Sequence, residues 1–140
     1  MTNGIKIADL DSSILLLDIL NNIEGQEYFW SVLYLEARGD LGDEKSIPDL
    51  EERVSESENG MKFDWNSLND LAGKFDQVID IVLIGCRDQT ILGRFGSDEE
   101  MYDKSDIVIE MVDSTYWLIH AQDQSIVADL SHCFNAKKWG

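Results

Sequence analysis

Basic residues are scarce in this sequence. Eleven lysines and arginines stand against 28 aspartates and glutamates, so the 140-residue chain has a formal net charge of −17 at pH 7. Self-repulsion at this charge costs stability, and it disfavours contact with DNA, RNA or an anionic membrane surface. It favours fast, electrostatically steered association with a basic protein. The charge therefore predicts a basic protein partner, and neither nucleic acid nor membrane.

Cysteine, proline and long apolar runs are also rare. The two cysteines, Cys86 and Cys133, are too few for a disulfide framework, and each lies in or beside an apolar stretch that suits a reduced thiol. No apolar run approaches the about 20 residues of a membrane span, and the N-terminus has no signal-peptide pattern. With one proline and 44% apolar residues, we expect one globular cytoplasmic domain, residues 1–140.

Helical patterns are concentrated in the first half of the chain. Asp11 or Ser12 can cap a first helix that ends at Gly25. Ser46 can cap a second helix, with Pro48 in its first turn. Asp64 can cap a third, whose apolar positions follow the i, i+3, i+4, i+7 pattern of a core-facing stripe. These apolar positions are Leu68, Leu71, Ala72 and Phe75.

Strand patterns follow in the second half. Residues 77–86 form a β-branched run, and three further segments at 107–112, 116–121 and 125–130 are separated by short polar turns, as in an antiparallel meander. Residues 29–35 can be strand or helix, and their aromatic content favours strand. The predicted fold class is α+β, with N-terminal helices packed on a C-terminal antiparallel β-meander sheet.

The acidic segment 96–106 is expected to be a loop that enters a strand, and an acidic loop could hold a metal ion. Counted from Asp98, an EF-hand loop would need an oxygen ligand at position 5, glycine at position 6 and glutamate at position 12. The sequence has Tyr102, Asp103 and Ile109 at these positions. The two cysteines and two histidines also lack zinc-ligand spacing. No metal and no cofactor is therefore expected.

Catalytic motifs are weak as well. The chain has no nucleophile elbow, no phosphate-binding glycine loop and no His-Glu-x-x-His helix. Asp80, Glu110 and Asp129 interrupt apolar segments and could converge as the carboxylates of a small hydrolase, although such residues more often mark the solvated face of a sheet. His120 is expected to be a packed or sheet-surface histidine. The protein is therefore expected not to be an enzyme.

Binding is the function that the acidic residues favour. Within the first cluster, Tyr102 and Met101 could supply an apolar anchor amid the charge, as aromatic residues do at interface hot spots. The alternative for any one of these residues is a solvated surface position. The predicted partner-binding residues are Asp98, Glu99, Glu100, Tyr102, Asp103 and Asp106 in one cluster, and Asp49, Glu51, Glu52 and Glu56 in a second.

Two stretches, FDWNSLNDLAGKFDQVIDIVLIG (residues 63–85) and SDIVIEMVDSTYWLIHAQDQSIVADL (residues 105–130), resemble the immunity proteins of bacterial toxin–immunity systems, including contact-dependent growth inhibition. The resemblance implies a protein that binds a cognate toxin domain, often a basic nuclease, and blocks its active site or substrate groove with carboxylates in place of substrate phosphates. The resemblance identifies no particular contact residue in this sequence. The acidic partner-binding residues named above are inferred from charge alone. The oligomeric state stays open.

The sequence thus predicts an immunity protein that neutralises a toxin domain, with a basic nuclease as the expected partner. The alternative within binding is a nucleic-acid mimic that inhibits a DNA- or RNA-binding enzyme. The alternative from another class is the carboxylate-dependent hydrolase. A partner with a positively charged cleft would favour either binding function, whereas metal-dependent turnover would favour the hydrolase.

Overall fold

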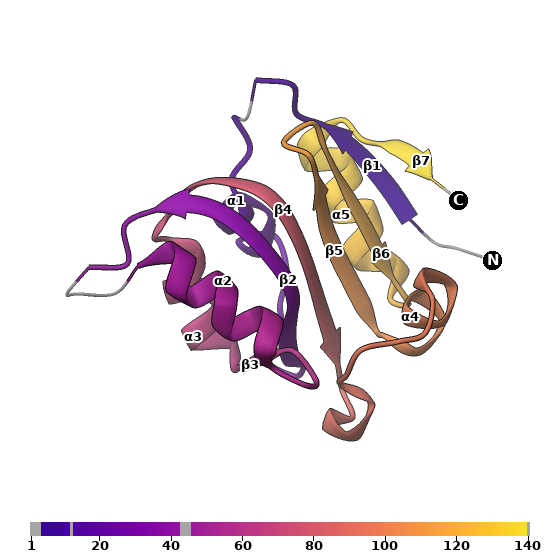
Figure 1. Ribbon diagram of the computed structural model, residues 1–140. Helices are drawn as coiled ribbons and strands as arrows, with labels where there is room; N and C mark the ends of the chain where they lie inside the picture. Colours follow the sequence, from indigo (N-terminus) through magenta and orange to yellow (C-terminus); the bar gives the residue numbers. More distant parts are fainter. Residues whose placement is uncertain (1–3, 12, 43–45, 140) are drawn as a thin grey trace.

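The computed structural model describes residues 4–11, 13–42 and 46–139, and seven strands within them form one antiparallel sheet (Figure 1). The strands are β1 (Gly4–Ala8), β2 (Phe29–Gly39), β3 (Met61–Phe63), β4 (Phe75–Cys86), β5 (Ile107–Val112), β6 (Tyr116–Ala121) and β7 (Lys137–Trp139). Their order is β3-β2-β4-β5-β6-β1-β7. The short strands β3 and β7 therefore lie at the two edges of the sheet.

Five α-helices and one 3₁₀ turn connect these strands within the described ranges. They are α1 (Leu16–Leu20), α2 (Ile47–Glu56), α3 (Trp65–Ala72), η1 (Gln89–Ile91), α4 (Asp98–Lys104) and α5 (Gln124–Phe134). The mixed α+β class is confirmed. The helices, however, are interspersed among the strands, so the predicted separation of N-terminal helices from a C-terminal sheet is not what the structure shows. No helix in the described ranges has the length and apolarity to cross a membrane.

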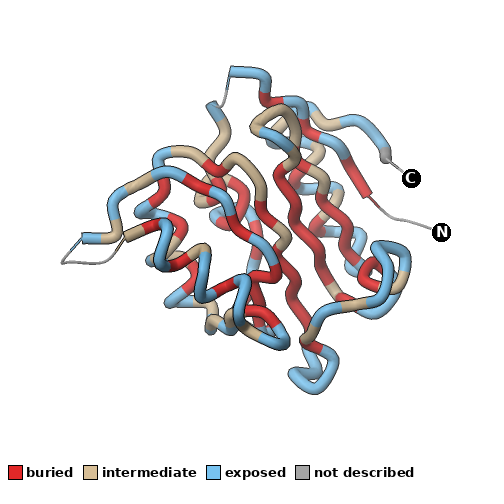
Figure 2. The backbone as a smooth tube through the Cα atoms, viewed as in Figure 1, coloured by how far each residue is buried: buried red, intermediate tan, exposed pale blue. Residues whose placement is uncertain are grey.

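The core lies mainly on one face of the sheet. Alternate residues of β5, such as Ile107, Ile109 and Met111, join a large cluster that also contains the buried residues of α1, α2, α3 and α5. Figure 2 shows this buried band running through the central strands. The period-two alternation of a strand places one apolar set on this face and leaves the intervening residues for the other.

The opposite face of the sheet has a smaller cluster. Leu33, Ile84 and Val108 point away from the large cluster and are covered by Met101 and Tyr102 of α4. The helix α4 therefore covers only part of this face. Further along the same face, Tyr34 is 52% exposed.

The segment 125–130, predicted as a strand, lies within the helix α5. The Asp123 side chain accepts a hydrogen bond from the Ser125 backbone N–H (3.0 Å) and caps the helix. Ile126 and Leu130, four residues apart, are the buried positions, which is helical periodicity. The helix ends at Asn135 in a left-handed conformation (φ 52°). The predicted three-segment meander is therefore wrong in its last segment.

The first predicted helix is shorter than expected. Asp11 does not cap it, and Ser12 lies outside the described residues. The helix α1 begins at Leu16, and Asp18 accepts a hydrogen bond from the Leu15 backbone N–H (2.8 Å). Gly25 lies beyond its end, and its carbonyl accepts a hydrogen bond from the Trp30 indole (3.0 Å).

Other predictions are confirmed. Ser46 caps α2, and the Asp64 carboxylate accepts a hydrogen bond from the Ser67 N–H (2.8 Å) at the start of α3. The segment 29–35 is the start of β2, so strand was the correct alternative. The strands β5 and β6 have the predicted bounds and form a hairpin whose turn holds Asp113 and Ser114 at positive φ. In these segments, local patterning and tertiary packing favour the same conformation.

Candidate functional site

The acidic cluster at 98–106 forms a short helix and its C-terminal connection, whereas the sequence predicted a loop. Ser97 caps α4, and its side chain accepts a hydrogen bond from the Glu100 N–H (3.2 Å). Asp98, Glu99 and Glu100 occupy the first turn, where negative charge is favourable near the positive helix end. Much of this charge therefore has a local structural explanation.

Tyr102 and Met101 are not exposed anchors as predicted. Both side chains are buried against the sheet. The Tyr102 hydroxyl donates a hydrogen bond to the Glu110 carboxylate (3.0 Å), and its ring lies 5.4 Å from the ring of His120. These contacts hold α4 on the sheet. The sequence pattern did not show that the sheet offers an apolar surface on which this short helix can bury Met101 and Tyr102.

Asp106 is likewise used inside the fold. Its carboxylate accepts a hydrogen bond from the Arg87 N–H (2.7 Å), and its backbone bonds to Gly85 and Gln122. Glu100 forms an ion pair with Lys104 (3.2 Å). The members of the cluster that stand exposed are Asp98, Glu99 and Asp103.

Titratable groups beneath α4 have shifted pKa values. Burial raises the pKa of Glu110, and the negative charge of Asp98 adds to this, while the hydrogen bond from Tyr102 opposes it. Burial lowers the pKa of His120 and raises that of Tyr102. No partner for the His120 Nδ1 atom is found in the described part of the chain. The set is a packed polar group that holds α4 in place.

The second acidic cluster is divided by the orientation of its helix. Asp49, Glu52 and Glu56 are exposed on α2. Glu51 instead accepts a hydrogen bond from the Ala37 backbone N–H (2.9 Å). That N–H belongs to β2 beyond its pairing with β3, so Glu51 satisfies an edge donor. Glu51 is therefore a structural residue, while the other three form an acidic surface.

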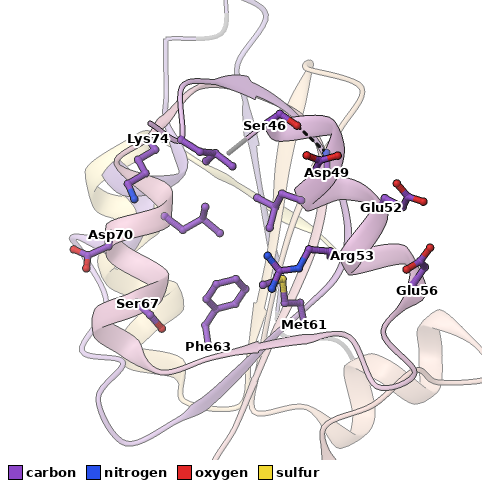
Figure 3. A pocket seen from close by; sticks show the side chains of 13 residues that line it. Ser46, Asp49, Glu52, Arg53, Glu56, Met61, Phe63, Ser67, Asp70 and Lys74 are labelled. Carbon is purple, nitrogen blue, oxygen red and sulfur yellow. Dashed lines mark hydrogen bonds between the residues drawn. The ribbon is translucent and has the colours of Figure 1, made fainter. Parts of the chain in front are cut away.

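A pocket of about 770 Å³ lies beside these exposed acids, and we call it the α2–α3 pocket. Figure 3 shows α2 and α3 flanking it, with β3 at its lower end. Its apolar lining residues are Leu41, Leu50, Met61, Phe63 and Leu71, and its charged lining residues are Asp49, Glu52, Arg53, Glu56, Asp70 and Lys74. Asp49, Glu52 and Glu56 were predicted from the sequence. The apolar lining was not, because it comes from four separate segments.

Arg53 and Phe63 differ in orientation from the acids around them. In Figure 3, Arg53 extends from α2 toward the middle of the pocket and Phe63 rises from β3, whereas Glu52 and Glu56 point outward. The carboxylates therefore surround an apolar depression that has one guanidinium over it. This combination can bind an apolar group next to positive charge.

Backbone geometry at Gly60 positions β3 at the end of the pocket. Gly60 has a φ of +80°, which L residues rarely adopt. A Cβ here would also meet the Ser31 hydroxyl, the Leu33 side chain at 2.7 Å and the Val32 carbonyl oxygen at 2.9 Å. Glycine therefore permits the tight turn that brings Met61 and Phe63 beside β2.

Arg94 is a positioning residue that the sequence analysis missed. Its guanidinium donates to the backbone carbonyls of Leu33 (2.6 Å), Val54 (2.8 Å) and Ser57 (3.2 Å). It thereby ties the end of α2 to β2. Its neighbourhood in the sequence, a short GRFG segment, indicates only a turn, so no sequence signal identifies this role.

The carboxylates proposed for a hydrolase are used separately. Asp80 accepts a hydrogen bond from the Asp113 N–H (2.9 Å), Glu110 binds Tyr102, and Asp129 lies on α5 across the sheet. Among the described residues, no group of three or more His, Cys, Asp or Glu side chains could hold a metal ion. The three carboxylates therefore do not converge on one site.

Comparison of the chain with protein-family models, curated proteins and solved structures finds no match.

Proposed function

We propose that this protein is a noncatalytic immunity protein that binds and neutralises a cognate toxin domain, with a basic nuclease as the partner. The proposal is supported by one observation: most acidic side chains of the described residues are exposed, and few of them form ion pairs. Within the described residues, ion pairs are found only between Arg87 and Glu27 (3.1 Å) and between Lys104 and Glu100 (3.2 Å). Two acidic residues of the described ranges, Asp9 and Glu110, are buried, and most of the others are exposed to water.

Unpaired surface charge of one sign raises the rate of encounter with an oppositely charged protein. Here the charge is present on α2 and on α4, which lie on different parts of the molecule (Figure 1). A basic nuclease domain has a positive substrate groove, and an acidic protein bound over that groove excludes the nucleic acid. In this proposal the protein acts in the cytoplasm of the cell that it protects.

The proposal expects a gene for a nuclease domain beside the gene for this protein, and the test uses that nuclease domain. We expect stoichiometric binding, loss of nuclease activity in the complex, and an association rate that falls steeply as added salt shortens the Debye length to about 8 Å near 0.15 M. Stopped-flow binding at several salt concentrations, with a nuclease assay in parallel, measures all three. A nuclease that stays unbound and active at low salt would contradict the proposal.

A further inference from the structure

The α2–α3 pocket is the part of the acidic surface where charge and apolar surface meet. Leu41, Met61, Phe63 and Leu71 are only partly buried by the core that they pack against. The pocket volume, about 770 Å³, lies within the range of pockets that take a ligand group. These four residues form the apolar floor of the pocket. The part of this floor that is exposed to water could be covered by a side chain of a partner.

The charges around this floor favour a cationic partner. Four carboxylates and two cations line the pocket, and none of these side chains belongs to either ion pair found in the described ranges. The side chains of Glu52 and Glu56 point outward from α2 at the rim of the pocket (Figure 3). A lysine or arginine that lies over this rim would therefore meet carboxylates that have no competing ionic partner.

Arg53 indicates what kind of side chain enters the pocket. Its guanidinium extends toward the pocket centre and pairs with no carboxylate of the described chain. A guanidinium is attracted to the face of an aromatic ring, and the Phe63 ring lines the same pocket. An aromatic side chain that entered here could lie against Phe63 and beneath Arg53, whereas an aliphatic one would gain only the apolar contact.

We propose that the α2–α3 pocket receives one aromatic side chain of the basic partner, flanked by lysines or arginines that meet the rim carboxylates. The inference rests on the proposed function, since it names the anchor by which the toxin domain is held. Buried aromatic anchors surrounded by complementary charge carry much of the affinity at protein interfaces.

A second copy of this chain does not fit the pocket as well. Among the side chains whose exposure the structure describes, the exposed aromatic ones are Phe29 (45%) and Tyr34 (52%), which lie near Glu27 and Glu36 in sequence rather than between basic residues. Two copies would also bring two acidic rims together. Both features disfavour self-association through the pocket, and analytical ultracentrifugation tests it below.

The first probe is a fluorescein-labelled peptide with a central tryptophan and two lysines on each side, titrated with the full-length protein at low ionic strength. Replacing the peptide's tryptophan with alanine should weaken binding about tenfold, and replacing its lysines with glutamates should abolish it. On the protein, Glu52→Lys with Glu56→Lys should weaken binding about tenfold. The matched control, Glu24→Lys with Asp129→Lys, changes the charge equally at exposed positions outside the pocket and should leave peptide affinity within about twofold.

The apolar part of the pocket is tested by Met61→Gln, with Leu118→Gln as its control. Leu118 is also partly buried but lies on β6, away from the pocket. Only Met61→Gln should weaken binding of the peptide, and circular dichroism verifies that both variants fold. Equal weakening by both charge pairs, or no binding to the wild-type protein, would overturn the proposal. A dimer in analytical ultracentrifugation that Glu52→Lys dissociates would assign the pocket to self-association instead.

The same variants are then measured against the neighbouring nuclease domain. If the nuclease binds all of them as it binds wild type, the pocket assignment is wrong and the proposed function stands. If the peptide follows the expected pattern but the nuclease does not bind wild-type protein, the proposed function is wrong and the pocket stands. If Glu52→Lys with Glu56→Lys and Met61→Gln both weaken the nuclease complex, both inferences hold.

Discussion

At the scale of single residues, two acids predicted to face a partner, Glu51 and Asp106, and one considered for a hydrolase, Glu110, accept hydrogen bonds within the fold. Glu51 accepts from a β2 backbone donor, and Asp106 accepts from the Arg87 N–H. Glu110 is 9% exposed and accepts from the Tyr102 hydroxyl. A buried carboxylate needs such a donor, because an unsatisfied buried charge is costly.

Burial raises the pKa of Glu110, and this has a consequence for stability. Its protonated form favours the fold below the ordinary value of 4.5, and that stabilisation is lost as pH rises through the higher folded pKa. We therefore expect Glu110→Gln to unfold at a higher temperature than wild type at pH 7 and at a similar temperature at pH 4. Each kcal/mol corresponds to roughly 4 °C in a domain of this size.

His120 acts in the opposite direction, since burial lowers its pKa and its stabilisation is lost as pH falls below the ordinary value of 6.5. The comparison must therefore be between Glu110→Gln and wild type at each pH, measured by calorimetry. Glu24→Gln, at an exposed position outside the helices, is the control and should show no such difference. A less stable Glu110→Gln at pH 7 would show that the ionised carboxylate is favourable.

At the scale of elements, the attachment of α2 to β2 decides whether the α2–α3 pocket exists. The apolar residues Ile47, Leu50 and Val54 bury one side of α2. Two polar contacts then hold α2 against β2. Glu51 of α2 accepts a hydrogen bond from the Ala37 N–H of β2, and Arg94 bridges the carbonyls of Leu33 in β2 and Val54 in α2. β2 extends well beyond its short partner β3, so these side chains replace a missing strand along its edge.

Arg94→Met should loosen α2. It leaves partly buried carbonyl oxygens at Leu33 and Val54 without donors, which should cost about 1–3 kcal/mol of unfolding free energy. Amide hydrogen exchange should accelerate most over residues 50–57. Arg87→Met is the matched control, because its ion pair with Glu27 is largely exposed and should be worth at most about 1 kcal/mol. Equal effects of the two substitutions would show that Arg94 does not hold α2.

At the scale of the whole molecule, the net charge of −17 opposes folding through self-repulsion. We expect the unfolding temperature to rise between 0.01 and 0.15 M sodium chloride, as the Debye length falls from about 30 to about 8 Å. Glu99→Lys with Asp103→Lys should reduce this salt dependence, because each reversal removes two negative units. Calorimetry at matched pH measures it, and a salt-independent unfolding temperature would contradict the argument.

The segments predicted correctly are those in which local chemistry and packing agree. Ser46 and Asp64 cap α2 and α3, and the period-two runs become β4, β5 and β6. The prediction failed at 125–130, where a short segment with four apolar residues fits either period and the Asp123 cap favours helix. It also overlooked β1 and β7, which are too short to be stable except as neighbours in a sheet.

The sequence by itself determined the charge of this protein, its helix caps and most of its central strands, because each depends on composition or on neighbours a few residues away. It also placed Asp49, Glu52 and Glu56 on one exposed helix. Tertiary packing, in contrast, buries Tyr102, places the Asp106 carboxylate at the Arg87 N–H and forms the α2–α3 pocket. The pocket joins Leu41, Leu50, Phe63 and Leu71, which are brought together by strand pairing and by the Arg94 contacts rather than by any local pattern.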